Sequence, residues 1–301
     1  MPSNRKKDLS RLECNVEELE KRQMLAGSVR ATITGAGNLV ITGDGNDNDI
    51  SVYLSEVGEV TIFANDGEDL DLTGIGVDGV FGDSQVTGNV TIRMRGGDDY
   101  VGLNGDGFVG EERDPPTVDR INVSGGGGSD YLSVRYINAN GNLTVNSGRG
   151  SYDYARVLVA SVSGNVAVTG GTAYLGFVSA EDIRIRGSQV TAFYLDSSDD
   201  VSISTGGGVD SVTVVGSEVT GTLSVNTGGN SYDDYIGDRA YIKYNNVGDL
   251  SVNMGGGRGD GLYIDNVISS NGGTLNGGGG TGDFLDIVDS PPLTNRGFEY
   301  V

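Results

Sequence analysis

From about residue 28 onward, short runs of alternating apolar and polar residues recur along the chain, separated by glycine-rich turns. At 88–92 a glycine and an asparagine precede Val-Thr-Ile, and a turn of glycines and aspartates follows at 96–99. The same order returns at 141–153 and at 248–264. Alternation with a period of two predicts β-strands, because successive side chains of a strand point to opposite faces.

The length of this repeat varies, which helps to choose between repeat architectures. Successive markers, taken as the first apolar residue of each phrase, lie 17 to 31 residues apart. The markers are Leu39, Val60, Val90, Ile121, Leu143, Val166, Ile183, Val201, Leu223, Leu250 and Leu275. A parallel β-helix keeps its strands short and lets its turns vary, so we expect an all-β, right-handed parallel β-helix of about ten or eleven coils. A β-sandwich is the alternative, but it does not explain the recurring order of residues.

Alternation also predicts which side chains face the interior of such a helix. One interior ladder should contain Val90, Ile92, Leu143, Val145, Val166, Val168, Ile183, Ile185, Val201, Ile203, Leu223, Val225, Leu250 and Val252. A second should contain Val101, Leu103, Leu132, Val134, Leu175, Phe177, Val212, Val214, Leu262 and Ile264. The residues before the first strand of each phrase should form a polar ladder at one corner, bonded to backbone groups. These residues are Asn38, Asn89, Asn142, Asn165, Asp182, Asp200 and Asp249.

Residues 9–25 differ from the rest of the chain, because leucines and a valine recur there at spacings near three and four among charged residues. This spacing predicts a short amphipathic helix. Ser10 and Glu13 form a potential capping box, and Gly27 is a suitable end. One interpretation is that this helix covers the open first coil of the domain that follows.

A second interpretation of the same segment comes from its motif. The residues that carry it are Arg11-Leu12-Glu13 followed by Val16-Glu17-Glu18-Leu19-Glu20-Lys21-Arg22-Gln23-Met24-Leu25-Ala26-Gly27. They resemble the Leu-Glu-x-Arg-x-Leu-Leu-Ala leader of planctomycete-type exported and surface proteins. The resemblance implies export or attachment at the cell envelope, in front of repetitive β-domains of unassigned function. We therefore expect a leader at 1–27, a β-helix at 28–289 and a tail at 290–301.

Composition and charge narrow the functional classes. The 301 residues include 52 glycines and no histidine, which excludes Ser-His-Asp, Cys-His and histidine-zinc sites. Lysine and arginine total 20 against 42 acidic residues, and the net charge of -22 opposes binding to nucleic acid. The single cysteine, Cys14, cannot form an internal disulfide. No apolar run reaches the roughly 18 residues that a membrane span needs, so we expect no transmembrane segment.

Aspartates follow the glycine-rich turns at regular positions and are the candidate metal ligands. They are Asp99, Asp130, Asp153, Asp210, Asp233, Asp260 and Asp283. The segment 125–133 fits the nonapeptide Gly-Gly-x-Gly-x-Asp-x-U-x of calcium-binding β-rolls. Carboxylates at coil spacing along one edge repel each other unless they accept hydrogen bonds from turn amides or bind Ca²⁺ between them. We favour the amide interpretation and keep calcium, the only cofactor considered, as the alternative.

The expected function is that of a non-enzymatic structural or adhesive module, exported or held at the bacterial cell surface. Its expected partners are cell-envelope or extracellular-matrix components, including polysaccharide, together with end-to-end self-association. No residue is expected to be catalytic, because the acid pairs 98–99, 199–200 and 233–234 are adjacent and adjacent strand residues face opposite sides. The alternatives are a lyase-like or glycosidase-like enzyme of polysaccharides and a calcium-stabilised binding domain.

Overall fold

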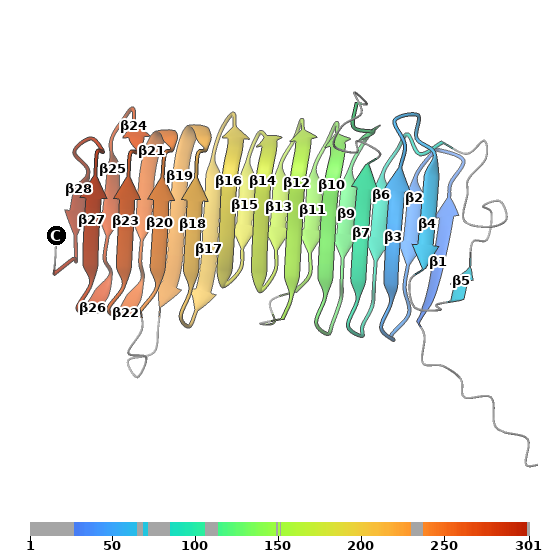
Figure 1. The fold of residues 1–301 in the computed structure, drawn as a ribbon, viewed down its shortest axis with the longest axis horizontal. Coiled ribbons are helices and arrows are strands. Elements are labelled where there is room, and N and C mark those ends of the chain that lie inside the picture. The colour runs from blue at the N-terminus through green and yellow to red at the C-terminus, as the bar shows by residue number, and fades with distance from the viewer. Residues whose placement is uncertain are drawn as a thin grey trace, which may run out of the picture.

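The computed structural model describes residues 27–64, 69–71, 85–105, 114–148, 150, 152–229 and 237–299. Within these residues every regular element is a β-strand, and the strands lie side by side across the long axis of an elongated molecule (Figure 1). None of the described segments is a helix long and apolar enough to cross a membrane. The predicted helix at 9–25 lies outside the described residues.

The strands of the first half are β1 (Ser28–Ile33), β2 (Leu39–Thr42), β3 (Asp49–Leu54), β4 (Val60–Ala64), β5 (Asp69–Asp71), β6 (Val90–Arg93), β7 (Tyr100–Gly105), β8 (Thr117–Val118), β9 (Ile121–Ser124), β10 (Tyr131–Ala139), β11 (Leu143–Asn146), β12 (Tyr154–Val162), β13 (Val166–Thr169) and β14 (Thr172–Ala180). Those of the second half are β15 (Ile183–Arg186), β16 (Gln189–Ser197), β17 (Val201–Gly207), β18 (Ser211–Val215), β19 (Glu218–Gly229), β20 (Arg239–Lys243), β21 (Asn246–Asn253), β22 (Gly256–Arg258), β23 (Gly261–Asp265), β24 (Ile268–Ser269), β25 (Gly273–Asn276), β26 (Gly279–Thr281), β27 (Phe284–Val288) and β28 (Thr294–Arg296).

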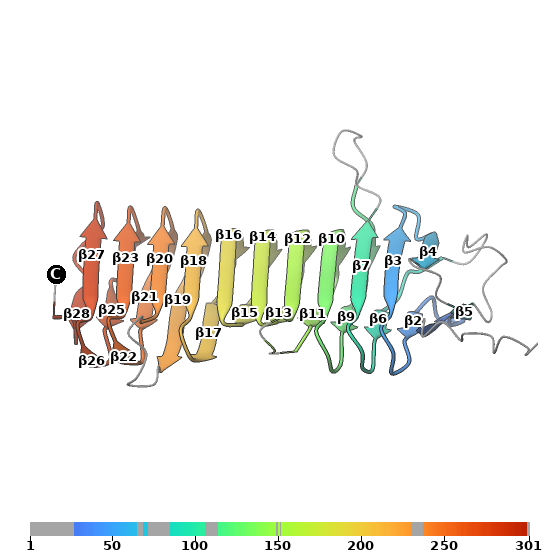
Figure 2. The ribbon, with the colours of Figure 1, turned by 60° about the horizontal axis from the view of Figure 1, so that its bottom comes forward.

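Two long ladders of parallel strands organise the sheet. Ladder A consists of β2, β6, β9, β11, β13, β15, β17, β19, β21, β25 and β28, each paired in parallel with the next. Ladder B consists of β3, β7, β10, β12, β14, β16, β18, β20, β23 and β27. Figure 2 shows the two ladders on different sides of the molecule. The chain alternates between them, so each strand hydrogen-bonds to its counterpart one repeat later.

The register places equivalent residues in columns, and the apolar columns form one core. In ladder A, Leu143 pairs with Val166, and Val201 pairs with Leu223. In ladder B, Leu132 pairs with Val101 and Ala155. The apolar residues predicted for the first interior ladder are all buried, at 0–2% exposure. That prediction is confirmed.

Three residues of the predicted pattern lie elsewhere. Val60 is in β4, which pairs antiparallel with β3, so it does not join the ladder A column. Leu275 pairs with Val252, and Gly273 occupies the place next to Leu250. The interior placement of Phe177 is wrong: its side chain is 52% exposed and its φ is 55°. The left-handed backbone at Phe177 turns the chain at a corner and interrupts the strict alternation of strand side chains.

The corner at Phe177 recurs in neighbouring rungs. Tyr136, Val159, Phe177 and Tyr194 have φ between 51° and 55°, and the strand pairings on either side of them place them in one column. Left-handed backbone costs a residue other than glycine roughly 1–2 kcal/mol. Tertiary structure therefore holds this conformation, because local preference opposes it.

The predicted polar ladder is present at another corner in two segments, because Arg120 occupies the slot between Asn89 and Asn142. The Asn89 backbone N–H donates to Asn38 Oδ1 at 2.7 Å, and the Asn165 N–H donates to Asn142 Oδ1 at 3.1 Å. The Asp182 N–H continues the series by donating to Asn165 Oδ1 at 3.3 Å. The side chains of this ladder thus satisfy backbone donors of the next rung, as expected.

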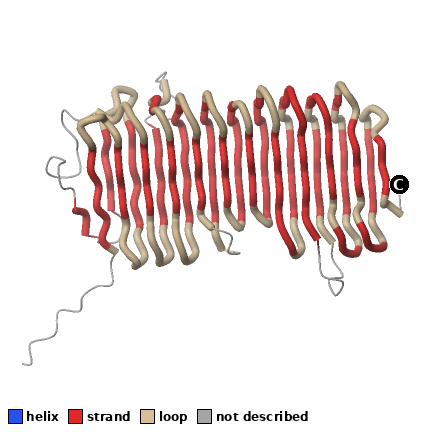
Figure 3. The backbone as a smooth tube through the Cα atoms, turned by 180° about the vertical axis from the view of Figure 1, so that it is seen from behind, coloured by secondary structure: helices blue, strands red, loops and turns tan. Residues whose placement is uncertain are grey.

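The two ends of the ladders differ. At the N-terminal end, β1 pairs antiparallel with β2, and β4 pairs antiparallel with β3. At the other end, β28 pairs in parallel with β25, so ladder A continues into the segment expected to be a tail. Figure 3 shows the strands succeeding one another from end to end, joined by loops at both edges.

The register makes a direct prediction about cross-linking. Ser202 and Ser224 are paired on the outer face of neighbouring rungs, and Ser251 lies one rung further on. In a Cys14→Ser background, the pair S202C/S224C should form a disulfide, because a rung spacing of about 4.8 Å lies within the usual Cα separation. The pair S202C/S251C is the control, since two rungs span about 9.6 Å. Thiol titration under mild oxidation measures both, and equal cross-linking of the two pairs would contradict the register.

Candidate functional sites: the aspartate column and a polar groove

The slot immediately before each ladder B strand carries an acidic residue in most rungs. These residues, which we call the aspartate column, are Asp99, Asp130, Asp153, Asp210, Asp238, Asp260 and Asp283. Their exposure is only 0–3%. In the two rungs between Asp153 and Asp210, the slot holds Gly171 and Ser188 instead. Backbone hydrogen bonds establish this placement: the N–H groups of Thr172, Gln189 and Ser211 donate in turn to the carbonyls of Asp153, Gly171 and Ser188. The column therefore has two segments.

The structure brings together six of the seven predicted aspartates. The seventh, Asp233, lies outside the described residues, and the structure places Asp238 in the column. The signal for Asp238 is its place directly before the alternating run of β20. The expectation that these carboxylates fringe an edge needs correction, because they are buried. Successive side chains of a strand face opposite sides. The side chain in this slot therefore points inward, and the first side chain of the strand that follows points outward.

Hydrogen bonds run regularly along the column. Asp130 Oδ1 accepts from the Asp99 N–H at 3.0 Å, and Asp153 Oδ1 accepts from the Asp130 N–H at 3.1 Å. In the second segment the same bonds are Asp210 N–H to Asp238 Oδ1 at 2.8 Å, Asp238 N–H to Asp260 Oδ1 at 2.9 Å, and Asp260 N–H to Asp283 Oδ1 at 3.2 Å. The predicted amide bonding is present, but its main donors belong to the preceding aspartate rather than to glycines.

The first segment ends on an asparagine. Asn48 occupies the slot before β3, and its backbone N–H and its side-chain Nδ2 both donate to Asp99 Oδ1 at 2.9 Å. At the other end of the segment, the Gly150 N–H donates to Asp153 Oδ2 at 2.5 Å. The slot thus accepts a carboxamide as well as a carboxylate.

Burial shifts the protonation of these carboxyls. Burial raises the pKa of Asp99 to about 7, although hydrogen bonds from Asn48 oppose the rise and the charge of Asp130 adds to it. Burial likewise raises the pKa of Asp260 to about 6, and it raises the pKa of Asp130, Asp210 and Asp283 above the ordinary range. Two charges about 5 Å apart repel by about 3 kcal/mol at an effective dielectric constant of about 20. Holding protons removes part of this repulsion.

The fit of calcium to the column can be judged from its contacts. Asp99 Oδ2 and Asp130 Oδ2 are buried without a hydrogen-bond partner, as free ligand atoms would be. However, each Oδ1 accepts an amide, and a Cβ added at Gly125 would lie 2.1 Å from Asp130 Oδ2, so backbone fills that side. Ca²⁺ requires six to eight oxygen ligands. The contacts favour the amide interpretation, and calcium at these aspartates stays a hypothesis.

A second acidic cluster lies at the polar corner of ladder A. Ligand oxygens of Asp182, Asp199 and Asp200 all lie within 4.8 Å of one another, and Asp199 and Asp200 are exposed. The Arg184 guanidinium lies 3.8 Å from Asp182 Oδ2. The sequence pattern placed Asp182 and Asp200 in one polar ladder, but it did not indicate that Asp199 joins them, because the position of Asp199 depends on the turn between the rungs.

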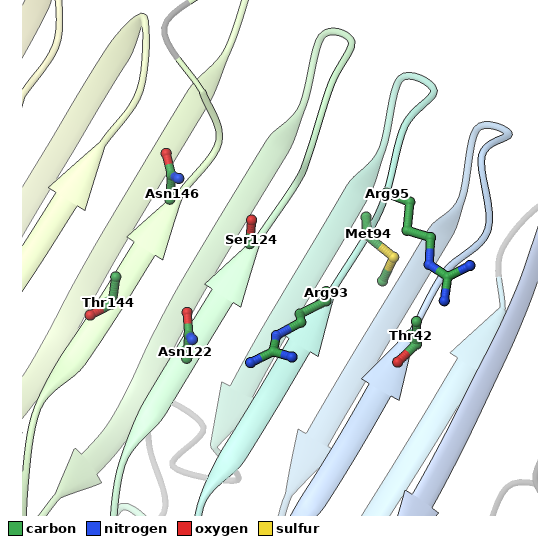
Figure 4. Close-up of a pocket in the computed structure, with 8 residues that line it drawn as sticks. All are labelled: Thr42, Arg93, Met94, Arg95, Asn122, Ser124, Thr144 and Asn146. Atoms are coloured by element: carbon green, nitrogen blue, oxygen red, sulfur yellow. The ribbon is translucent and has the colours of Figure 1, made fainter.

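A polar groove crosses the outer face of ladder A (Figure 4). Its volume is about 550 Å³. Its lining consists of Thr42, Arg93, Met94, Arg95, Asn122, Ser124, Thr144 and Asn146, which belong to β2, β6, β9 and β11 or follow them directly. These residues include two guanidinium groups and no carboxylate. No local sequence pattern indicates this groove, since its residues are spread from Thr42 to Asn146 along the chain.

The outer face of ladder B carries aromatic side chains. The rings of Tyr100, Tyr131 and Tyr154 stack at centroid distances of 4.9 and 4.7 Å. The ring of Phe193 covers Gly176, where a Cβ would lie 2.1 Å from Phe193 Cζ. These contacts join neighbouring rungs on the outside, as the apolar columns do inside.

Comparison with known proteins gave no match: no family model, no curated protein and no solved structure matches this chain.

The raised pKa values predict how stability depends on pH. Above about pH 4 the folded chain holds protons that the unfolded chain has lost, on Asp260 up to about pH 6 and on Asp99 up to about pH 7, so the free energy of unfolding should fall as pH rises. Asp99→Asn should reduce the difference in unfolding free energy between pH 5 and pH 8 by about 2 kcal/mol. Denaturant unfolding at both pH values measures this. The exposed Asp119→Asn is the control, and an unchanged difference in Asp99→Asn would contradict the assignment.

Calcium titration of the melting temperature separates the two interpretations of the acidic residues. Because amides already occupy the column, millimolar Ca²⁺ should leave the melting temperature unchanged. A rise would contradict this expectation. Loss of such a rise in D199N/D200N would assign the ion to the exposed cluster, whereas its loss in Asp99→Asn would assign it to the column.

Proposed function

We propose that the chain is a right-handed parallel β-helix that serves as a non-enzymatic structural and adhesive module, exported or held at the bacterial cell surface. The alternation of the chain between ladders A and B supports the helical winding, because each repeat returns to the position of the one before. Right-handed crossovers prevail between parallel strands, which supports the handedness.

The observation that carries the functional proposal is the continuity of both ladders along one axis. Ladder A runs from β2 to β28 and ladder B from β3 to β27, around a single cluster of buried residues. In such a structure each rung is stabilised by its neighbours, so stability is nearly a sum of nearest-neighbour contributions. The result is a rod whose outer faces are long regular surfaces, which suits a scaffold that spans distance and presents binding groups.

Two further features favour a location outside the cell. The segment at 11–27 resembles the leader of exported planctomycete-type proteins, and the net charge of -22 keeps an extended surface solvated. The expected partners are envelope or matrix components, including polysaccharide, and further copies of the rod joined end to end. Binding is favoured over cleavage of polysaccharide at the polar groove, because its eight lining residues include no carboxylate that can act as an acid or base.

Cell fractionation tests the proposed location. The intact chain and a chain beginning at residue 28 should be expressed, each with the same tag, in a planctomycete host. We expect the intact chain in the envelope or culture fraction and the shortened chain in the cytoplasm. Cytoplasmic retention of the intact chain would contradict the proposal, and export of both chains would remove the leader from it.

A further inference from the structure

The polar groove on ladder A combines features that are unusual for so acidic a chain. Arg93 and Arg95 contribute two positive charges to a protein in which acidic residues outnumber basic ones by 42 to 20. Both side chains are exposed, and in Figure 4 they diverge, Arg93 toward Asn122 and Arg95 toward Thr42. Within the described part of the chain neither guanidinium forms an ion pair. The groove therefore presents two positive charges that no carboxylate of the described residues pairs with.

The remaining lining residues define what else the ligand must offer. Asn122 and Asn146 present carboxamides, and Thr42, Ser124 and Thr144 present hydroxyls. Each of these groups both donates and accepts hydrogen bonds. The one apolar residue of the lining, Met94, is only 3% exposed, so the groove exposes no large apolar side chain against which a side chain of a peptide could pack. A ligand rich in hydroxyl groups matches this lining.

The shape of the groove indicates a linear ligand. Its residues come from four successive rungs of ladder A, and three rung spacings amount to about 14 Å along the axis of the molecule. Strands cross this direction, so a bound chain would lie across β2, β6, β9 and β11. A short polymer segment fits this length better than a single small molecule.

The density of charge distinguishes between linear anions. A nucleic acid carries a phosphate on every nucleotide, and its binding depends on many cations that displace counterions. The groove supplies two guanidinium groups among five amide and hydroxyl side chains. A uronic acid polymer combines one carboxylate per sugar with several hydroxyls, and guanidinium groups bind carboxylates through paired hydrogen bonds.

We propose that the groove lined by Arg93, Arg95, Asn122 and Asn146 binds an acidic, uronate-containing polysaccharide without cleaving it. The two arginines hold carboxylates of different sugars, and the amide and hydroxyl side chains bond the ring hydroxyls between them. This inference rests on the proposed adhesive function and names its partner class.

Calorimetric titration with trigalacturonate tests the inference. The variant R93Q/R95Q should raise the dissociation constant about tenfold or more, because hydrogen bonds to charged groups contribute more than neutral ones. R186Q/R258Q is the charge-matched control, because both arginines are exposed, lie outside the groove and form no ion pair within the described residues. It should change the dissociation constant less than about twofold. The melting temperatures of both variants should equal that of the unchanged chain, since all four side chains are exposed.

Three results would overturn the inference. They are a failure of trigalacturonate to bind the unchanged chain, an equal loss of affinity in both variants, and equally tight binding of the methyl-esterified trimer, which lacks the negative charges. None of them changes where the intact chain is found in fractionated cells, so failure of the ligand and failure of the surface location can be told apart.

Discussion

The structure depends on the hydrogen bonding of each strand to its counterpart one repeat later. A single rung cannot bury its apolar side chains, and its backbone groups find partners only in the rungs above and below. In-register parallel pairing satisfies both needs at once, because it places Leu143 on Val166 inside and joins their strands through the backbone. Every column of like residues, inside or outside, is a consequence of this pairing.

The aspartate column shows what such pairing imposes on polar residues. Identical slots in successive rungs bring carboxyls together at rung spacing, in a place with almost no exposure. The backbone N–H of each aspartate is available at the same slot, and the next carboxyl accepts it, as between Asp99 and Asp130. Hydrogen bonding and retained protons thus stabilise an arrangement that bare charges would oppose. The carboxyls of the aspartate column are therefore structural elements of the turn.

The outer faces of the two ladders differ because side chains that point outward do not have to pack in the apolar core. Ladder B presents stacked rings such as Tyr131 and Tyr154, whereas the start of ladder A presents arginine, amide and hydroxyl groups. Equivalent side chains of successive rungs lie next to one another. A residue type that recurs at one position of the repeat therefore forms a long surface of one chemical kind. A rod of this construction can carry separate binding surfaces on separate faces without a change in its interior.

The sequence by itself determined the strands, the apolar columns of ladder A and the two polar segments Asn38–Asn89 and Asn142–Asp182, because side-chain alternation is a local property of extended backbone. Tertiary structure decided the rest. The antiparallel turn of β4, the outward position of Phe177, the place of Asp238 in the column and the meeting of Thr42 with Asn146 in one groove depend on corners and turn lengths. These set the register between rungs, and register is a relation between distant segments that no local pattern contains.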